Sequence, residues 1–322
     1  MPFFNTSKDF VGTSNRWWYY SIELLPNIIA KGQYEDNFPM LPRMMLRRCA
    51  IEAMECLDIG SMEGLIPALM ARRGARRVLA TDAIDHCVEK IAVVKHYHGV
   101  EFEYQSVGLM YELNKKLPDQ SFDLINCSGL LYHVVAPFMV LAGVRPLLRR
   151  NGLMIVSTNV ACVNDYSMEF NNGGRLQTEA NTFWYISIPL FDYILRYLRL
   201  APIDCLYLSH ANVQSHIRYL ADKPSGYLSV VCRAVDESLA TDDDNWMRGS
   251  AHDSWEYLGL IDWRRAEGNS FSDIEYYGNQ ERHHFRSDIS SIDLWQAVNE
   301  VAPLKMTERS SDTHILKLED RS

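Results

Sequence analysis

The sequence predicts an α/β protein built on a doubly wound, Rossmann-like, seven-stranded and mostly parallel sheet. Apolar runs that lack polar alternation, as in strands covered on both faces, alternate with helix-like segments from residue 56 to residue 157. A glycine turn joins the first strand to a helix, as at the start of a nucleotide-binding half of such a sheet. Two more strand-like runs follow, at 203–208 and 227–232. We therefore expect ligands at the carboxyl ends of the parallel strands.

Each element has a local signal. Residues 41–54 are expected to form a helix that leads into a strand at 56–59, and after the turn from Gly60 to Gly64 a helix follows from Leu65. A second strand at 78–80 ends on Asp82. Further along we expect strands at 100–104, 122–127 and 153–157, and helices at 83–98 and 140–148. A loop or lid with a glycine hinge is expected at 160–182, followed by a helix at 183–200 with Pro189 near its start.

These elements suggest three regions. Residues 1–50 would form an N-terminal helical and aromatic cap, and residues 51–235 the nucleotide-binding domain, with the lid and substrate region at 160–200. Residues 236–322 would form a C-terminal helical extension, preceded by an acidic linker.

The turn from Gly60 to Gly64 has features that suit ligand binding. Glycine lets the backbone turn tightly and approach a ligand, and the following helix offers unpaired N–H groups to a carboxylate or phosphate. An acid at the end of the next strand, here Asp82, can accept hydrogen bonds from both ribose hydroxyls. The Gly-x-Gly-x-x-Gly fingerprint of dinucleotide enzymes is absent. A glycine turn needed for its shape alone is the other interpretation.

Composition limits the function classes. A formal net charge of −9 disfavours a broad phosphate-binding surface, although a local basic groove is compatible with it. No apolar run approaches the roughly 20 residues that span a bilayer, and no signal peptide opens the chain. The seven cysteines are scattered without a Cys-x-x-Cys pair, which indicates reduced core thiols in a cytoplasmic protein. His283 and His284 are adjacent and lack supporting ligands, so no metal site is expected.

Four motifs in order resemble one family. The segment from Asp58 to Gly64 resembles motif I, Asp-x-Gly-x-x-x-Gly, of class I S-adenosylmethionine (SAM) methyltransferases. The other three are Trp18 to Leu24, which resembles Trp-Tyr-His-x-Ile-Asp-Leu, the run from Phe122 to His133 with Pro137 after it, and the segment 147–158. Together they are similar to the branch that includes the tRNA uridine-34 carboxymethyltransferase and its uncharacterised relatives. Tyr20 replaces the histidine of the first motif, which puts a shared substrate in doubt.

The resemblance implies SAM as cofactor and assigns residues to it. The methionine part would lie against Asp58, Gly60, Ser61 and Gly64. The other cofactor contacts implied are Asp82 and Ala83 at the ribose, Tyr111 and Glu112 at the adenine edge, and Ser128 beside the sulfonium. The tRNA enzyme uses carboxy-SAM and holds its extra carboxylate with cationic residues. Such residues have no clear counterpart here, so plain SAM is the expected donor.

Candidates for catalysis and acceptor binding each have two interpretations. His133 follows the fourth strand and is either a general base or a histidine that fixes the loop. Glu169 in the lid is either a base or a solvated acid, and Tyr20 is a further catalytic candidate. The aromatic residues Trp18, Tyr20 and Tyr185 would either line an acceptor site or pack in the core.

Three hypotheses follow. The leading one is a SAM-dependent methyltransferase that acts on a small, partly aromatic or apolar metabolite at oxygen, nitrogen or carbon, in secondary metabolism. The second is a tRNA wobble-uridine (carboxy)methyl-type transferase, and the third is a non-catalytic binding module with the SAM fold. We expect a small-molecule partner and no membrane partner, with a homodimer as one oligomeric option. Nucleic acid is the less favoured partner, which the tRNA hypothesis keeps open.

Overall fold

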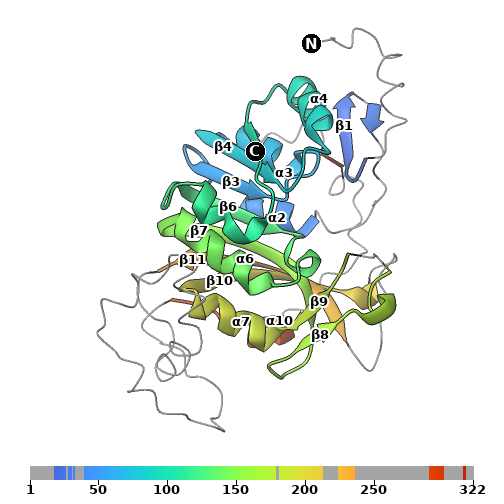
Figure 1. Ribbon diagram of the computed structural model, residues 1–322, viewed down its shortest axis with the longest axis vertical. Helices are drawn as coiled ribbons and strands as arrows, with labels where there is room; N and C mark the ends of the chain where they lie inside the picture. The colour runs from blue at the N-terminus through green and yellow to red at the C-terminus, as the bar shows by residue number, and fades with distance from the viewer. Residues whose placement is uncertain are drawn as a thin grey trace.

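A computed structural model describes residues 18–26, 28–30, 32, 40–178, 181–212, 224–235, 290–300 and 315–316. Within these residues a central sheet has the strand order β10-β11-β7-β6-β3-β4-β5 (Figure 1). The strands are β3 (Glu55–Ile59), β4 (Arg77–Asp82), β5 (Glu103–Ser106), β6 (Phe122–Ser128), β7 (Leu148–Ala161), β10 (Leu200–Ser209) and β11 (Ser225–Ala234). From β5 to β7 the neighbours are parallel, and β11 runs antiparallel to both β7 and β10. The predicted doubly wound α/β fold is confirmed.

The chain reverses its direction of travel across the sheet between β3 and β6. After β3 it adds β4 and β5 on one side, and then returns to place β6 and β7 on the other. Asp58 in β3 is paired in register with Asn126 in β6. In open α/β sheets this switch point leaves a crevice beyond the strand ends, where ligands bind.

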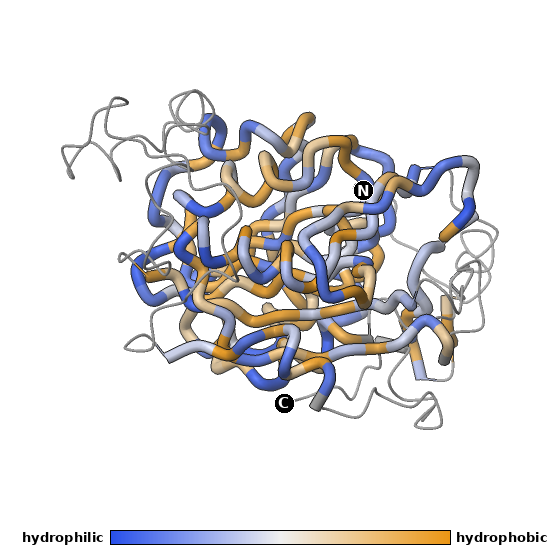
Figure 2. Tube along the Cα trace, turned by 90° about the horizontal axis from the view of Figure 1, so that it is seen from below, coloured by the Kyte–Doolittle hydropathy of each residue, from blue (hydrophilic) through white to orange (hydrophobic). Residues whose placement is uncertain are grey.

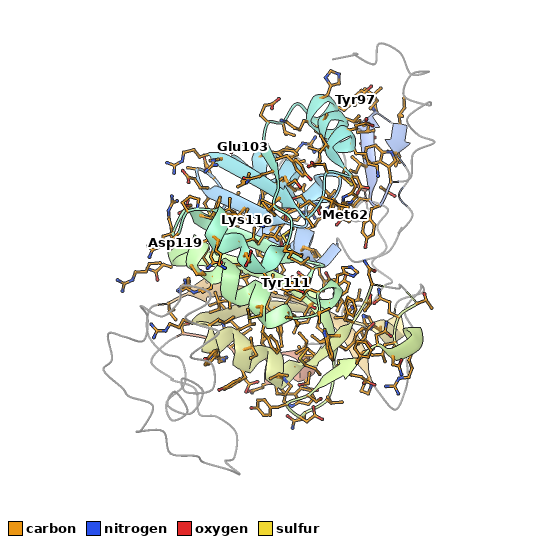
Figure 3. All side chains as sticks on the ribbon, viewed as in Figure 1. Met62, Tyr97, Glu103, Tyr111, Lys116 and Asp119 are labelled. Carbon is orange, nitrogen blue, oxygen red and sulfur yellow. The ribbon has the colours of Figure 1, made fainter. Side chains whose placement is uncertain are left out.

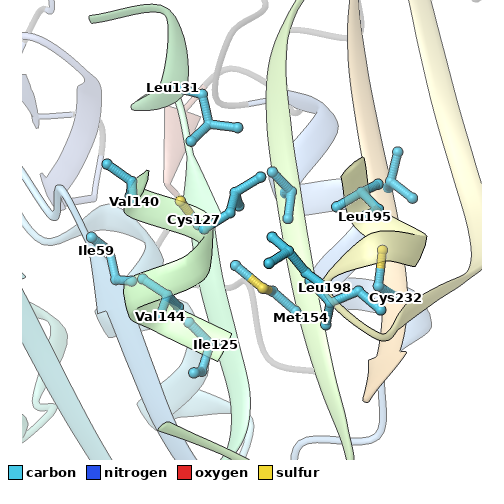
Figure 4. Packing of buried hydrophobic residues seen from close by; sticks show 14 of the residues in the cluster. Ile59, Ile125, Cys127, Leu131, Val140, Val144, Met154, Leu195, Leu198 and Cys232 are labelled. Carbon is cyan, nitrogen blue, oxygen red and sulfur yellow. The ribbon is translucent and has the colours of Figure 1, made fainter. Parts of the chain in front are cut away.

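Helices cover both faces of the sheet, and each face has its own core. One core joins the sheet to α6 (Pro137–Val144), α7 (Ile188–Tyr197) and α10 (Leu294–Glu300), and Figure 4 shows its centre around Ile125 and Met154. The other core lies against α2 (Met40–Arg48), α3 (Leu65–Arg72) and α4 (Val88–His98). The short α5 (Leu113–Lys116) contacts α6. Figure 2 shows the apolar chain concentrated in the middle of the molecule.

The lid region differs from the expected helix over 183–200. Its first residues form a strand, β9 (Trp184–Ser187), which pairs with β7 and with β8 (Met168–Phe170). The helix α7 begins only at Ile188, because Pro189 lacks an N–H group and is tolerated in the first turn of a helix. The sheet therefore gains two short strands beside its seven principal ones.

The N-terminal cap contains strands as well as a helix. β1 (Ser21–Leu25) and β2 (Ile28–Ala30) are antiparallel, and β12 (Ile315–Leu316) pairs with β1. Other boundaries also move: α2 ends at Arg48 rather than 54, and α4 begins at Val88 rather than 83. The strand expected at 100–104 begins instead at Glu103, since Val100 and Phe102 pack into the core before it.

Most of the expected C-terminal extension at 236–322 lies outside the described residues. The part that is described, α10, packs against α7 and β10, with Leu294 and Val298 in the main core. Its anchor is a buried ion pair on α7, between Arg196 Nε and Asp192 Oδ1 at 2.8 Å. Arg196 also donates to Ser291 Oγ at 2.8 Å and to the Ile292 carbonyl, while Asp192 accepts the Leu294 N–H.

Within the described part of the chain, helices long and apolar enough to cross a lipid bilayer are absent. Likewise, the described residues contain no cluster of three or more His, Cys, Asp or Glu side chains that could hold a metal ion.

Candidate functional site

A cavity of about 660 Å³ opens at the carboxyl ends of β3, β4 and β6, where the switch point leads us to expect a ligand. Its wall comes from the loops after these strands and from the N-terminal segment. Met62 and Tyr111, which both line it, are labelled in Figure 3, while Asp119 lies at the opposite ends of the strands, before β6. Nine of the predicted site residues line this cavity: Tyr20, Asp58, Gly60, Ser61, Asp82, Ala83, Tyr111, Ser128 and His133.

The loop from Gly60 to Gly64, hereafter called the donor loop after the role proposed for it below, has three residues with left-handed backbone conformations. Gly60, Met62 and Gly64 have φ angles of +77°, +47° and +84°. The N–H groups of Gly60 and Ser61 donate to the Thr81 carbonyl at 2.9 and 3.0 Å, which ties the loop to β4. Gly64 lies at the N-terminus of α3. Glycine suits these turns because it adopts positive φ at little cost.

Asp58 is the buried acid at the centre of the site. It is 2% exposed, and its Oδ1 accepts the Asn126 Nδ2–H at 2.7 Å across the switch point. Asn126 in turn accepts the Ser128 hydroxyl at 2.7 Å. Burial raises the pKa of Asp58 to about 6, although hydrogen bonds from Ser61 and Asn126 act in the opposite direction. A cationic ligand group beside Asp58 would favour its charged form.

Asp82 closes β4 and is tied to the donor loop. Its Oδ2 accepts the Met62 N–H at 3.0 Å, and its Oδ1 accepts the Ala83 N–H at 2.7 Å. A carboxylate offers about four lone-pair sites, so these two bonds leave acceptor capacity on both oxygens. Asp82 can therefore receive two hydroxyl groups without releasing the loop.

Aromatic side chains form another part of the wall. Tyr19 and Tyr20 meet edge to face, with ring centroids 4.9 Å apart, and Tyr132 and Tyr227 do so at 6.4 Å. Burial raises the pKa of Tyr20 and that of Tyr227 well above the ordinary value, so both phenols are neutral near pH 7. Such a wall suits a planar or apolar group.

His133 reaches the cavity from the 3₁₀ turn after β6. Its Nδ1 lies 3.0 Å from the Asn181 carbonyl oxygen. A carbonyl only accepts hydrogen bonds, so Nδ1 carries the proton in this contact, and in the neutral ring Nε2 then carries the lone pair. That tautomer can accept a proton at Nε2.

Five predicted site residues do not line the cavity. Trp18 is buried beneath Lys90, and Gly64 packs its Cα side against Phe102. Glu112 pairs with Lys115 at 3.1 Å, and Glu169 on β8 forms an ion pair with Arg175. Tyr185 is 1% exposed and donates to Gln177 Oε1 at 3.3 Å. For Trp18 and Tyr185 the core-packing interpretation fits their placement.

The prediction missed several lining residues, of which Asn126, Tyr132 and Tyr227 matter most. Asn126 lies inside an apolar run, and it could have been found as a polar residue opposite Asp58 on the neighbouring strand. Tyr227 comes from β11, some 95 residues further on, and no local sequence signal relates it to β6. Among the described lining residues are two aspartates and two histidines, Asp58, Asp82, His86 and His133, but no lysine or arginine.

Comparison with known proteins agrees with this geometry. Residues 57–156, which run from β3 through β7, match the family model described as "Methyltransferase domain". Over these residues the chain is similar to a methyltransferase domain. The match supports the prediction of a SAM-dependent methyltransferase. The matched residues contain the donor loop, Asp82, Ser128 and His133.

Similarity to individual proteins extends over about 150 residues of the chain. The chain is 30% identical over 152 residues to a ubiquinone biosynthesis O-methyltransferase of Aeromonas salmonicida, and 27% identical over 156 residues to that of Histophilus somni. These alignments cover 46% and 47% of this chain and 59% and 61% of the relatives. The chain therefore spans about three fifths of the length of the curated relatives it matches.

The fold of the chain has solved counterparts. The N-terminal domain of EvdMO1 with S-adenosylhomocysteine (SAH) bound superposes with a TM-score of 0.52 at 16% identity, covering 71% of this chain and 97% of that one. This likeness shows the Rossmann-like methyltransferase fold.

Proposed function

We propose that the protein is a SAM-dependent methyltransferase that acts on a small, partly aromatic or apolar metabolite at oxygen, nitrogen or carbon. One observation carries the proposal: a single cavity at the sheet's switch point is lined by two carboxylates and also by neutral phenols and a histidine. A methyltransferase must hold a cationic donor and an acceptor in one enclosure, because the methyl group passes directly between them.

The donor end would be formed by the acids. Asp58 would pair with the ammonium of the methionine part, which fits a carboxyl that gains from a cationic neighbour, and Asp82 would accept the ribose hydroxyls. Ala83 and Tyr111 would flank the adenine, with Ser128 near the sulfonium. Two carboxylates favour plain SAM, which is a net cation, over carboxy-SAM, which adds a negative charge.

His133 is the proposed general base. The acceptor loses a proton as its O–H, N–H or C–H group attacks the methyl carbon, and Nε2 of the tautomer fixed by Asn181 can take that proton. Tyr20 would position the acceptor as part of the aromatic wall. Glu169 is not proposed as a base, because it pairs with Arg175 and does not line the cavity.

The relatives support a small acceptor and favour oxygen among the candidate atoms. Both are named as O-methyltransferases of ubiquinone biosynthesis, so a hydroxyl acceptor is the first to test. We also propose residues 51–235 as the SAM-binding domain, with 160–200 as its substrate-facing part.

The test uses the full chain with methyl-labelled SAM and a small-molecule extract depleted of macromolecules. A labelled product below about 1 kDa is expected, and the His133→Asn protein serves as the matched negative control. If the wild type binds SAH and labels no small molecule or macromolecule, the chain is a binding module with the SAM fold and the enzymatic proposal is wrong.

The tRNA-modifying alternative rests on the sequence resemblance to the uridine-34 branch. Its discriminating property is salt dependence, because phosphate contacts make tRNA affinity fall steeply between low and moderate salt. The net charge of −9 favours weak tRNA retention at all salt concentrations. Strong retention at 50 mM salt that is lost at 200 mM, together with labelling of tRNA, would favour the alternative.

A further inference from the structure

Glu63, in the middle of the donor loop, is a fully buried acid with no place in the chemistry described so far. Its exposure is 0%. Its Oε1 accepts two hydrogen bonds, from the Tyr19 N–H at 2.7 Å and from Lys90 Nζ at 3.1 Å. Its Oε2 accepts no hydrogen bond from the described residues. This one side chain therefore contacts two other segments of the protein.

Three segments meet at Glu63. The acid belongs to the donor loop, Lys90 to α4, and Tyr19 to the start of the N-terminal cap. Lys90 Nζ also lies over the Trp18 ring, 5.6 Å from its centroid, and α4 contacts β1. The lysine side chain is only 13% exposed. A cation–π contact and a charged hydrogen bond thus hold the same few residues of the cap.

Because of its position in the sequence, Glu63 lies between the proposed ribose ligand and the aromatic wall of the cavity. Its neighbour Met62 donates its N–H to Asp82, the proposed ribose ligand. On the other side, Tyr19 and Tyr20 line the cavity. Glu63 therefore links the residue after Met62 to the aromatic wall through a partly buried hydrogen bond.

The hydrogen bond from the Tyr19 N–H does not by itself require a charged side chain at residue 63. A buried carboxylate with one oxygen lacking a hydrogen bond is costly, and a neutral glutamine could also accept the Tyr19 N–H, although more weakly. What the carboxylate adds is the attraction for Lys90, which draws α4 and the cap against the loop. The charge is therefore best explained by the connection between these segments.

We propose that Glu63 is a positioning residue that couples donor binding to closure of the aromatic wall: donor in the loop stabilises the Glu63–Lys90–Tyr19 contact, and this contact orders residues 18–26 over the acceptor space. The inference rests on the proposed function, since it takes the loop to be the donor site. Binding then follows an order, with the donor bound before the acceptor wall is complete.

The experiment measures hydrogen–deuterium exchange of the peptide spanning residues 18–26 in the full chain, with and without SAH, alongside calorimetric SAH binding. Lys90→Met and Glu63→Gln break the charged contact in two different ways. Lys95→Met is the matched control, because Lys95 lies on the same helix and also combines an ion pair, to Glu101 at 2.9 Å, with a cation–π contact, to Phe102.

In the wild type and in Lys95→Met, SAH is expected to slow exchange of the peptide by about tenfold or more, as local opening is suppressed. In Lys90→Met and Glu63→Gln this SAH-dependent slowing should be lost and the Kd for SAH should rise, because coupling is reciprocal. Equal slowing by SAH in all four proteins would overturn the inference while leaving the proposed function intact. Failure of the folded wild type to bind SAH would instead overturn both.

Discussion

The Asp82 carboxylate accepts the Met62 backbone N–H at 3.0 Å, and so joins the end of β4 to the middle of the donor loop. The acid proposed to bind the donor thus also shapes the loop that is proposed to face it. Met62 is one of few non-glycine residues with positive φ among the described residues, a conformation that a neighbouring acceptor helps to hold.

Replacement of Asp82 should weaken donor binding. Asp82→Asn removes the charge and one acceptor site, and the Kd for SAH is expected to rise about 10- to 100-fold, the range for a lost charged hydrogen bond. Calorimetry measures it. Asp85→Asn is the control, since it changes net charge equally at an exposed position nearby. An Asp82→Asn protein that binds SAH as the wild type does would contradict the assignment.

Donor affinity should depend on pH through Asp58. Its pKa is raised to about 6 in the free protein, and a bound ammonium would lower it, so binding releases a proton below that pH. The SAH affinity should rise with pH by up to about tenfold per unit below pH 6 and become constant above pH 7. Asp58→Asn should remove this dependence. Asp192→Asn should retain it, although burial raises the Asp192 pKa to about 6 as well.

The same acid should affect stability in the opposite sense. A folded-state pKa above the unfolded value gives a contribution that is complete below about pH 4 and is lost as the pH rises through 6. Asp58→Asn should therefore raise the free energy of unfolding of the unliganded protein at pH 8, by at most about 3 kcal/mol. Thermal unfolding at pH 8 and pH 5 tests it. A Tm increase of equal size at both pH values would argue against this cause.

Loss of His133 should affect turnover and leave donor binding unchanged. His133→Asn keeps an N–H group for the Asn181 carbonyl and removes the base, so kcat should fall about 10²- to 10⁴-fold. The Kd for SAH should stay within about twofold. Glu169→Gln is the control and should retain activity, since Glu169 pairs with Arg175. A large decrease for Glu169→Gln with none for His133→Asn would reverse the two assignments.

Gly64 should be more sensitive to substitution than a comparable loop glycine. In Gly64→Ala the new Cβ would lie 3.0 Å from Phe102 Cζ, at a φ of +84°. Gly173 has a φ of +61° with no atom within 4 Å of the Cβ position, so Gly173→Ala isolates the backbone cost of about 1–2 kcal/mol. Chemical denaturation should show Gly64→Ala losing more stability than Gly173→Ala. Equal losses would mean that Phe102 moves freely aside.

Prediction from the sequence succeeded where the residues that identify an element lie within that element. The motif from Asp58 to Gly64 and the acid Asp82 belong to two consecutive strands and one turn, and the cavity does lie there. The strand alternation likewise predicted the sheet, because apolar runs of this length are local features.

Prediction failed where tertiary contacts decide. Residues 184–187 have apolar spacing compatible with a helix, and they form β9 because the end of β7 offers an unpaired edge. Tyr185 then points into the core and Tyr227, from another strand, takes a place in the wall. No periodicity within either segment contains that information.

The anchor of α10 has a consequence for how the chain can be divided. Asp192 and Arg196 lie on the face of α7 that is turned toward the core. Several of their hydrogen-bond partners come from residues 291–294, about 100 residues further along the chain. A protein shortened at residue 235 would leave two charges in an apolar surface with part of their partners gone, and would uncover the side chains beneath Leu294. We expect such a fragment to aggregate, and the boundary of the smallest soluble catalytic piece to fall after residue 300.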